Sequence, residues 1–179
     1  KIMAASGFLL ELVNNVLDMN KLESGEVQLE AKTFCVRDLV EESAAMIEAQ
    51  TAEKALTLHR DIRCDRSDRA IGSPLHVRQV LQNLLSNAVR YNRVGGEIFL
   101  SARETARTEE TVAYEFVVRD TGVGMSEAFQ QRAFEPFAQE DAGARSSYTG
   151  TGLGLAIVKE LVEKMGGTIR LESRKGAGT

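Results

Sequence analysis

A seam of apolar residues in the first 19 positions is the feature that most restricts how this chain can fold. The residues recur at alternating steps of three and four, as Ile2, Ala5, Leu9, Leu12, Val16 and Met19, and Leu10, Val13 and Leu17 widen the apolar face. The pattern predicts a helix that ends near Gly25, because glycine suits the conformation that terminates helices. Such a helix is not stable alone in water, so we expect it to pair between chains or with a segment outside this sequence.

The composition is that of a globular protein. Of the 179 residues, 43% are apolar and 27% are charged, which is enough for one domain with a sizeable core and an additional segment. The net charge of −4 and the scattered basic residues argue against nucleic acid as a ligand. Cys35 and Cys64 fit reduced thiols better than a metal site or a disulfide framework.

No apolar run is long enough to cross a bilayer, and no secretion signal is present. We therefore expect a cytoplasmic segment without membrane contact, and leave open a membrane anchor elsewhere in the full-length protein. The helical pattern already runs at Lys1, which suggests a fragment of a longer protein.

Helical and strand-like patterns are mixed along the rest of the chain. Period-two patterns predict strands over residues 27–34, 56–62, 97–103, 112–119 and 168–173. Apolar periodicity predicts helices over residues 36–52 and 153–165, and a further helix that begins at Pro74, runs through Ala88 and stops before Gly95-Gly96. Ser73 and Pro74 mark a helix start, because a serine hydroxyl caps helices and proline suits the first turn. The mixture favours an α+β fold, a two-layer sandwich.

Two asparagines lie four residues apart on the helix that follows Pro74. Asn83 and Asn87 project from one face of this helix, while the neighbouring leucines reach the core. Amides in an apolar helix need hydrogen-bond partners, which are either nearby backbone groups or a ligand.

Two glycine-rich segments follow. In Asp120-Thr121-Gly122-Val123-Gly124 the glycines let the backbone bend close to a planar ligand, although the pattern alone is more typical of an ordinary β-turn. Gly150-Thr151-Gly152-Leu153-Gly154 opens a helix, where backbone N–H groups favour phosphate. It matches neither the dinucleotide fingerprint nor a Walker P-loop.

The order and spacing of these segments resemble the catalytic ATP-binding domain of sensor histidine kinases, in the superfamily of gyrase, chaperone, kinase and mismatch-repair ATPases. Residues 79–91 resemble its N box, 120–125 its G1 box, 134–139 its F box and 150–155 its G2 box. Residues 10–30 are similar to the second helix of the family's dimerisation and histidine-phosphotransfer stem.

The resemblance implies a division of the chain and a fold. Residues 1–25 would be part of the stem, and residues 26–179 a catalytic domain without its final strand. This domain would have the Bergerat ATP-binding fold, with a mixed, mostly antiparallel sheet and helices on one face.

The resemblance also implies a role for each site residue, with ATP and Mg²⁺ as ligands. Asp120 would accept a hydrogen bond from the adenine amino group and so select ATP over GTP, and Asn87 would bind Mg²⁺ through its amide oxygen. The other implied nucleotide-binding residues are Asn83, Arg90, Tyr91, Gly122, Gly124, Gly150, Thr151, Gly152, Leu153 and Gly154. Residues 138–149 would form a mobile lid, with Phe134 and Phe137 packed at its hinge.

Asn83 separates the branches of the superfamily. The chaperone, gyrase and mismatch-repair branches carry at this place a glutamate that activates water, whereas a neutral amide cannot act as a general base. We therefore expect phosphoryl transfer with slow hydrolysis, which fits a two-component protein histidine kinase.

The family's phosphoacceptor motif does not occur in the sequence. His59 and His76 are expected to be surface or capping residues. The resemblance thus implies a fragment that cannot autophosphorylate alone. Its expected partners are a stem helix with the acceptor histidine, a second copy in a full-length homodimer, and the receiver domain of a response regulator.

Three other functions share this fold. They are a non-catalytic nucleotide-sensing module, an anti-sigma-type serine kinase, and a hydrolysing ATPase clamp. Asn87, Asp120 and the glycines disfavour the first, the apolar helix over residues 2–19 disfavours the second, and Asn83 disfavours the third.

Overall fold

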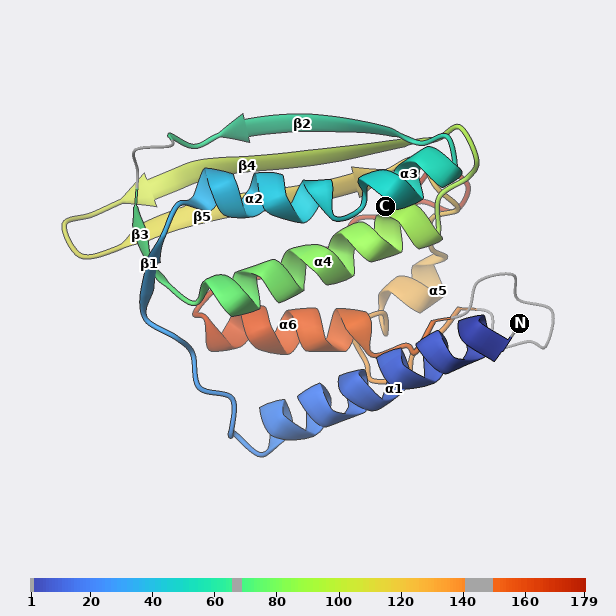
Figure 1. The fold of residues 1–179 in the computed structure, drawn as a ribbon, viewed down its shortest axis with the longest axis horizontal. Helices are drawn as coiled ribbons and strands as arrows, with labels where there is room; N and C mark the ends of the chain where they lie inside the picture. The colour runs from blue at the N-terminus through green and yellow to red at the C-terminus, as the bar shows by residue number, and fades with distance from the viewer. Residues whose placement is uncertain (1, 66–68, 141–149) are drawn as a thin grey trace.

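A sheet, a layer of helices and an outer N-terminal helix make up the fold (Figure 1). The computed structural model describes residues 2–65, 69–140 and 150–179. The elements in chain order are α1 (Ile2–Glu23), β1 (Lys32–Phe34), α2 (Val36–Ala45), α3 (Glu48–Glu53), β2 (Thr57–Arg63), β3 (Ala70–Gly72), α4 (Pro74–Arg90), β4 (Glu97–Arg107), β5 (Val112–Asp120), α5 (Glu127–Gln130) and α6 (Gly154–Lys164).

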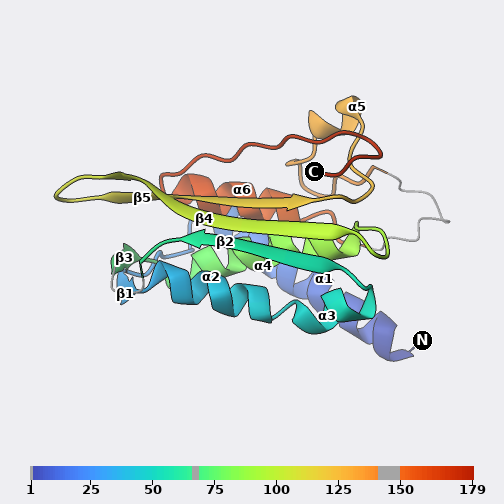
Figure 2. The same ribbon diagram turned by 90° about the horizontal axis from the view of Figure 1, so that it is seen from above.

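The main sheet has the strand order β2-β4-β5 and is mixed. Strands β2 and β4 run parallel, with Leu58 opposite Ile98, and β4 and β5 form an antiparallel hairpin, with Leu100 opposite Val118. Strands β1 and β3 form a separate antiparallel pair. Helices α2, α4 and α6 all lie on one face of the main sheet (Figures 1 and 2). The expected α+β two-layer class with a mixed sheet is confirmed.

The main core lies between this sheet and the helices. Ile98, Leu100 and Ala102 alternate along β4 and are buried, as expected for a strand with one face on a core. They pack with Leu81 and Leu85 of α4 in one apolar cluster. The α4 periodicity expected from the sequence is therefore correct, and it fixes this helix against the sheet.

Helix α1 finds an apolar partner within the chain. Its buried residues Met19 and Leu22 pack with Ile157 and Leu161 of α6 and with Val80 of α4. The expectation that α1 has no partner in this chain is therefore wrong for this face. A connection over residues 24–31 leads from α1 to β1.

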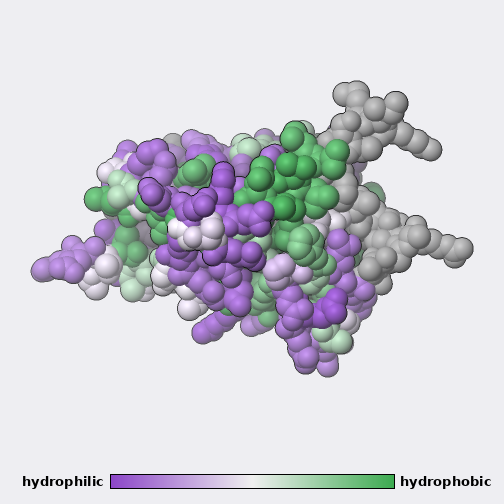
Figure 3. Space-filling model, turned by 90° about the horizontal axis from the view of Figure 1, so that it is seen from below, coloured by the Kyte–Doolittle hydropathy of each residue, from purple (hydrophilic) through white to green (hydrophobic). Residues whose placement is uncertain are grey.

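The opposite face of α1 remains apolar and exposed. Its exposed large residues are Leu9, Leu10, Val13 and Leu17. Figure 3, which views the molecule from below, shows apolar surface on this side. None of the helices in the described part of the chain is both long and apolar enough to cross a membrane.

Three expected elements differ in extent. The strand over 27–34 is formed only at Lys32–Phe34, because Val27 packs with the α1–α6 cluster instead of entering a sheet. The helix over 36–52 is divided after Ala45, and the break buries Ile47 in the main core.

The third element is residues 168–173, where the prediction of a strand is wrong. These residues pair with no strand in the described ranges. A cleft of about 300 Å³ lies between the end of β5, at Arg119 and Asp120, and the C-terminal segment, at Glu172–Arg174 and residues 177–179. Bonds from Met125 and Gln130 hold Ser173 at the end of this segment, but residues 168–173 form no backbone ladder with β5.

The helix ends and the two histidines agree only in part with what the sequence predicts. Gly25, with φ of +73°, ends α1 as expected, and Pro74 begins α4. Ser73, however, makes no side-chain cap. Its hydroxyl accepts the Glu30 N–H (3.2 Å) and bonds to Nδ1 of His76 (2.6 Å). His76 is therefore buried and not a surface residue.

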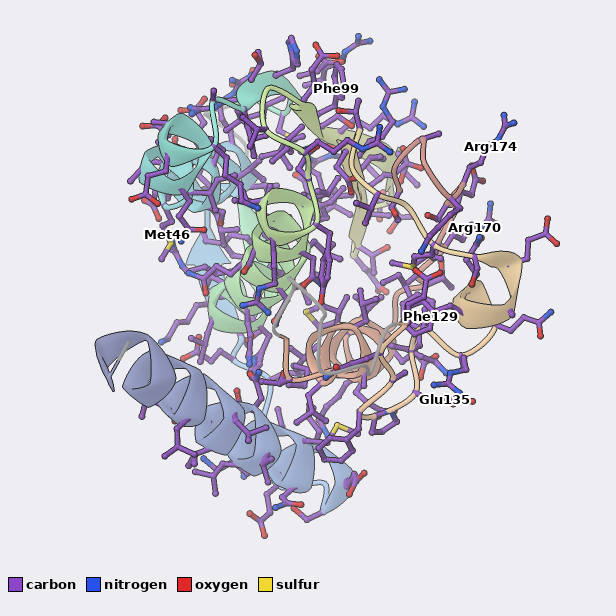
Figure 4. The ribbon with its side chains drawn as sticks, turned by 90° about the vertical axis from the view of Figure 1, so that its right-hand side faces the viewer. Met46, Phe99, Phe129, Glu135, Arg170 and Arg174 are labelled. Atoms are coloured by element: carbon purple, nitrogen blue, oxygen red, sulfur yellow. The ribbon has the colours of Figure 1, made fainter. Side chains whose placement is uncertain are left out.

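His59 is exposed as expected. It stacks on Phe99, with ring centroids 4.5 Å apart, on the sheet face that turns away from the helices. Figure 4 labels Phe99 on this side of the sheet.

Replacing Leu85 by alanine should lower the free energy of unfolding by about 2–5 kcal/mol, because the residue is 0% exposed and truncation leaves a cavity. Urea denaturation measures this change. Leu75→Ala on the same helix is the matched control, because Leu75 is 57% exposed, and it should cost less than about 1 kcal/mol. Equal losses in the two variants would contradict the packing described for α4.

Candidate nucleotide-binding site

The second half of α4 carries the two asparagines on one side of the helix. The Asn83 Nδ2 donates to the Gln79 carbonyl within the helix (3.1 Å). No residue in the described ranges hydrogen-bonds the Asn87 carboxamide, which is only partly buried. For Asn83 the structure favours the first alternative, a bond to a nearby backbone group, whereas Asn87 has no such bond among the described residues.

A tight turn at the end of β5 positions Asp120. The Gly122 N–H donates to Asp120 Oδ1 (2.8 Å), and the Thr121 N–H donates to the Glu97 carbonyl (3.1 Å). The Val123 N–H donates to the Tyr91 carbonyl (3.0 Å). Through this last bond the turn is held against the C-terminal end of α4.

Gly122 is required for that close approach. A Cβ atom there would lie 2.8 Å from Asp120 Oδ1 and against the Tyr91 carbonyl oxygen. Gly124, with φ of +61°, instead contacts the backbone of Arg174 and Gly178. The structure therefore places Gly122 at the site and gives Gly124 a role in the C-terminal turn.

The glycine-rich segment before α6 approaches the same end of α4. A Cβ atom on Gly150 would lie 2.8 Å from Tyr91 Oη and 3.2 Å from Arg90 Nη1. A Cβ atom on Gly154 would lie 3.2 Å from Asn83 Oδ1 and 3.9 Å from Asn87 Nδ2. The Asp120 turn and the glycine-rich segment, which are far apart in the sequence, thus both meet the C-terminal half of α4.

Two residues of the glycine-rich segment turn away from this meeting point. Leu153 is fully buried in the cluster formed by α1, α4 and α6. Thr151 is also buried, and its Oγ1 accepts the Leu153 N–H (3.3 Å) and the Nδ2 of Asn15 (3.0 Å). The structure does not bring these two side chains to the site.

The residues of the F box support the segment before α6. Gly152, with φ of +71°, packs so closely that a Cβ atom would lie 2.9 Å from Phe137 Cα. The Phe137 side chain is 61% exposed, so the expectation that it packs at a hinge is wrong, whereas Phe134 is partly buried. Most of the expected lid, residues 141–149, lies outside the described residues.

The start of that expected lid is anchored. Glu140 accepts the Ser126 N–H (2.9 Å) and pairs with Lys175 (2.8 Å). Burial alone would raise the pKa of Glu140, but the bonds from Lys175 and Ser126 hold it below its ordinary value. Figure 4 shows α5, marked by Phe129, next to the C-terminal segment that carries Arg170 and Arg174.

The electrostatics of the site centre on Asp120. Burial raises the pKa of its carboxyl group above the ordinary value of 3.8, although the backbone N–H groups of Gly122 and Thr179 stabilise the charged form. Arg90 supplies a positive charge beside Gly150. The Asp120 carboxylate, the Asn87 carboxamide, the Arg90 guanidinium and the closely packed glycines are the groups here that could hold a nucleotide with its phosphates and Mg²⁺.

Sequence reasoning missed Asn15 and Asn92. Asn92 is buried, donates to the Glu97 carbonyl (3.0 Å) and accepts the Arg93 N–H (2.9 Å), and so shapes the loop next to Tyr91. Its position before Gly95-Gly96 was a possible signal, because asparagine stabilises turns. For Asn15 the signal was an amide within an apolar helix face.

The fold and this site define a nucleotide-binding α+β domain. Residues 72–179 match the family model described as histidine kinase-, DNA gyrase B-, and HSP90-like ATPase. The chain belongs to this family, and within it the chain is the catalytic ATP-binding domain of the sensor histidine kinase type. The resemblance inferred from the four motifs is confirmed.

Named relatives support the same assignment. The chain is 37% identical over 171 residues to the signal transduction histidine-protein kinase BarA of Escherichia coli K12, covering 96% of this chain and 18% of BarA. It is 38% identical over 173 residues to the circadian input-output histidine kinase CikA of Synechococcus elongatus, covering 96% of this chain and 22% of CikA. The chain thus spans about a fifth of the length of these relatives.

Solved structures agree with the fold. Full-length ShkA in complex with AMPPNP superposes with a TM-score of 0.78 at 28% identity, covering 95% of this chain and 34% of ShkA. The histidine kinase ThkA in complex with the response regulator TrrA superposes with a TM-score of 0.71 at 21% identity, covering 99% of this chain and 47% of that chain.

Gly122→Ala should lower the free energy of unfolding by about 1–3 kcal/mol, because the added Cβ has no room beside the Tyr91 carbonyl and Asp120. Thermal or urea denaturation measures this loss. Gly72→Ala is the matched control, since a Cβ atom there would make ordinary contact with Phe34 at 3.6 Å. A loss no larger than that of the control would contradict the close approach of the Asp120 turn to α4.

Proposed function

We propose that this chain binds Mg²⁺–ATP between α4, the Asp120 turn and the glycine-rich segment, and donates the γ-phosphoryl group to a histidine on a stem segment. A response-regulator aspartate then receives the phosphoryl group. The observation that carries the proposal is the convergence of Asn87, Asp120 and Gly154 around one helix end. The AMPPNP complex of the similar protein ShkA supports a nucleotide as the ligand.

Each residue has a role that its surroundings permit. Asp120 accepts a hydrogen bond from the adenine amino group, because its carboxylate is held in place by the Gly122 N–H. Asn87 offers its amide oxygen to Mg²⁺, which prefers oxygen ligands and supplies charge neutralisation for the phosphates. Arg90 offsets phosphate charge, and Tyr91 packs near the nucleotide.

The remaining residues line the phosphates. Gly150 and Gly154 bring backbone N–H groups within reach because they lack side chains that would collide with α4. Asn83 lines the pocket one turn before Asn87. Thr151, Gly152, Leu153 and Gly124 act through the backbone path that they set, since their side chains or Cβ positions face other parts of the protein.

The site favours transfer over hydrolysis. Asn83 occupies the place of a general base and is a neutral amide whose Nδ2 is bonded to the Gln79 carbonyl. No proton can be taken from water at this atom, so ATP persists until an acceptor arrives. The geometry thereby fits a kinase with slow hydrolysis.

The partners follow from the same proposal. Residues 1–25 form part of a stem, residues 26–179 form the catalytic domain, and the exposed apolar face of α1 pairs with the other stem helix in a homodimeric full-length protein. The acceptor histidine lies on that other helix. The neighbour ThkA has been solved with a response regulator, which supports a receiver domain as the next acceptor. We place the domain in the cytoplasm, where ATP is available.

A phosphoryl-transfer assay tests the proposal. The chain is mixed with labelled ATP, Mg²⁺ and a separately expressed stem helix that carries the acceptor histidine. We expect label on the histidine with the wild-type chain, and loss of both label and ATP binding in Asn87→Ala. Asn20→Ala, an exposed asparagine on α1, is the control that should transfer normally. ATP binding without transfer would favour a nucleotide-sensing module, label on serine an anti-sigma-type kinase, and fast ATP consumption without acceptor a hydrolysing clamp.

Nucleotide affinity should depend on pH through Asp120. The Asp120 carboxylate accepts a hydrogen bond from the adenine amino group best when it is ionised. Burial raises the pKa of this carboxyl group above the 3.8 of an ordinary aspartate. On acidification, the nucleotide affinity should therefore begin to fall at a higher pH than it would with an exposed aspartate. Asp120→Asn should bind about tenfold or more weakly at neutral pH. Both affinities are measured with an ATP analogue across a range of pH. Protonation of the analogue affects the two proteins equally, so it cancels in the ratio of wild-type to variant affinity.

The expected result is a ratio that shrinks as the pH falls. Asp61→Asn, an exposed aspartate on β2, should leave the affinity unchanged. A ratio that is constant with pH would contradict the assignment of Asp120 to the adenine.

A further inference from the structure

Among its described side chains, helix α1 makes two polar contacts, next to the apolar residues that pack on α6 and α4. Asn15 Nδ2 donates to Thr151 Oγ1 (3.0 Å), and Asp18 Oδ2 accepts from Gln79 Nε2 (2.8 Å). Asn15 and Asp18 lie on the same side of the helix as Met19 and Leu22, which are buried against α6. Both polar contacts therefore exist only while α1 is docked.

The Asn15 contact reaches the backbone that leads into the nucleotide site. Thr151 is 6% exposed, and its hydroxyl also accepts the Leu153 N–H (3.3 Å). This hydroxyl lies between Gly150, which approaches Tyr91, and Gly154, which approaches the two asparagines. Asn15 thus holds a buried hydroxyl that itself bonds the backbone of the glycine-rich segment.

The Asp18 contact reaches the other side of the site. Gln79 lies on α4, and its carbonyl accepts the Asn83 Nδ2 (3.1 Å). Helix α1 therefore holds both the glycine-rich segment and α4, the two elements that face each other across the site. The apolar contacts of Met19 and Leu22 supply the docking energy, and the polar contacts fix the register.

We propose that Asn15 is a positioning residue of the nucleotide site, and that docking of α1 and nucleotide binding are energetically coupled through its hydrogen bond to Thr151. The inference rests on the proposed ATP-binding function. With α1 docked, the three nucleotide-facing segments are together, so docking favours binding. By linkage, the nucleotide strengthens docking of α1 by the same factor.

Four variants of the full chain test the coupling, namely Asn15→Ala, Thr151→Val, the double variant, and Asn14→Ala. Asn14 is the matched control, because it is an exposed asparagine next to Asn15 on the same helix. The first measurement is the dissociation constant for a non-hydrolysable ATP analogue with Mg²⁺. The second is hydrogen exchange of the Leu153 amide without nucleotide, which reports the Thr151 bond directly.

Asn15→Ala should weaken analogue binding roughly three- to tenfold, the range that one net hydrogen bond implies. It should also speed exchange at Leu153, whereas Asn14→Ala should change neither quantity. In the Thr151→Val background, Asn15→Ala should have no further effect on affinity, since the acceptor is gone. A role of Asn15 in α1 stability alone would instead give additive losses in the double variant.

The outcomes separate this inference from the proposed function. A wild-type chain that binds no analogue would overturn the proposed function. A wild type that binds, with equal affinities for the Asn15→Ala and Asn14→Ala variants, would overturn only the coupling. Additive effects of the Asn15 and Thr151 substitutions would overturn it as well.

Discussion

The burial of α4 on two sides is the constraint on which the rest of the structure depends. Leu81 and Leu85 pack under the sheet, and Val80 packs with α6 and α1. A helix that is fixed on both sides has little freedom to rotate, so packing sets the direction of its polar side chains. Asn83 and Asn87 lie next to Val80 on the side that faces the start of α6, and apolar contacts on the same helix thus fix their placement.

Around this helix, the site consists largely of backbone. The Asp120 turn and the glycine-rich segment come close because their glycines have no side chains, and Gly122 N–H holds the Asp120 carboxylate. Burial of Asp120 raises its pKa, and the cost is tolerated because the same burial strengthens any hydrogen bond that the carboxylate accepts.

The sequence predicted the fold class, the central helix and the three motifs, because these depend on local periodicity and on glycine and proline chemistry. Predictions from the sequence failed where contacts with residues far away in the chain determine the local structure. The expected strand over residues 168–173 has no ladder partner, and the division of the helix after Ala45 depends on how Ile47 enters the core. Ser73 was expected to cap α4, but a distant N–H at Glu30 and the His76 ring take its hydroxyl. The Asn15 contact could not be predicted, because 136 positions separate it from Thr151.

The connection over residues 24–31 gives α1 a short tether to the domain that it covers. If α1 leaves its place beside α6, the tether keeps it at a local concentration on the order of millimolar, and it returns quickly. A free helix in solution competes poorly against α1 unless its own concentration approaches this local value. A competitor carried on the same assembly has a similar local concentration. Such a segment can therefore replace α1 beside α6 where a free helix cannot.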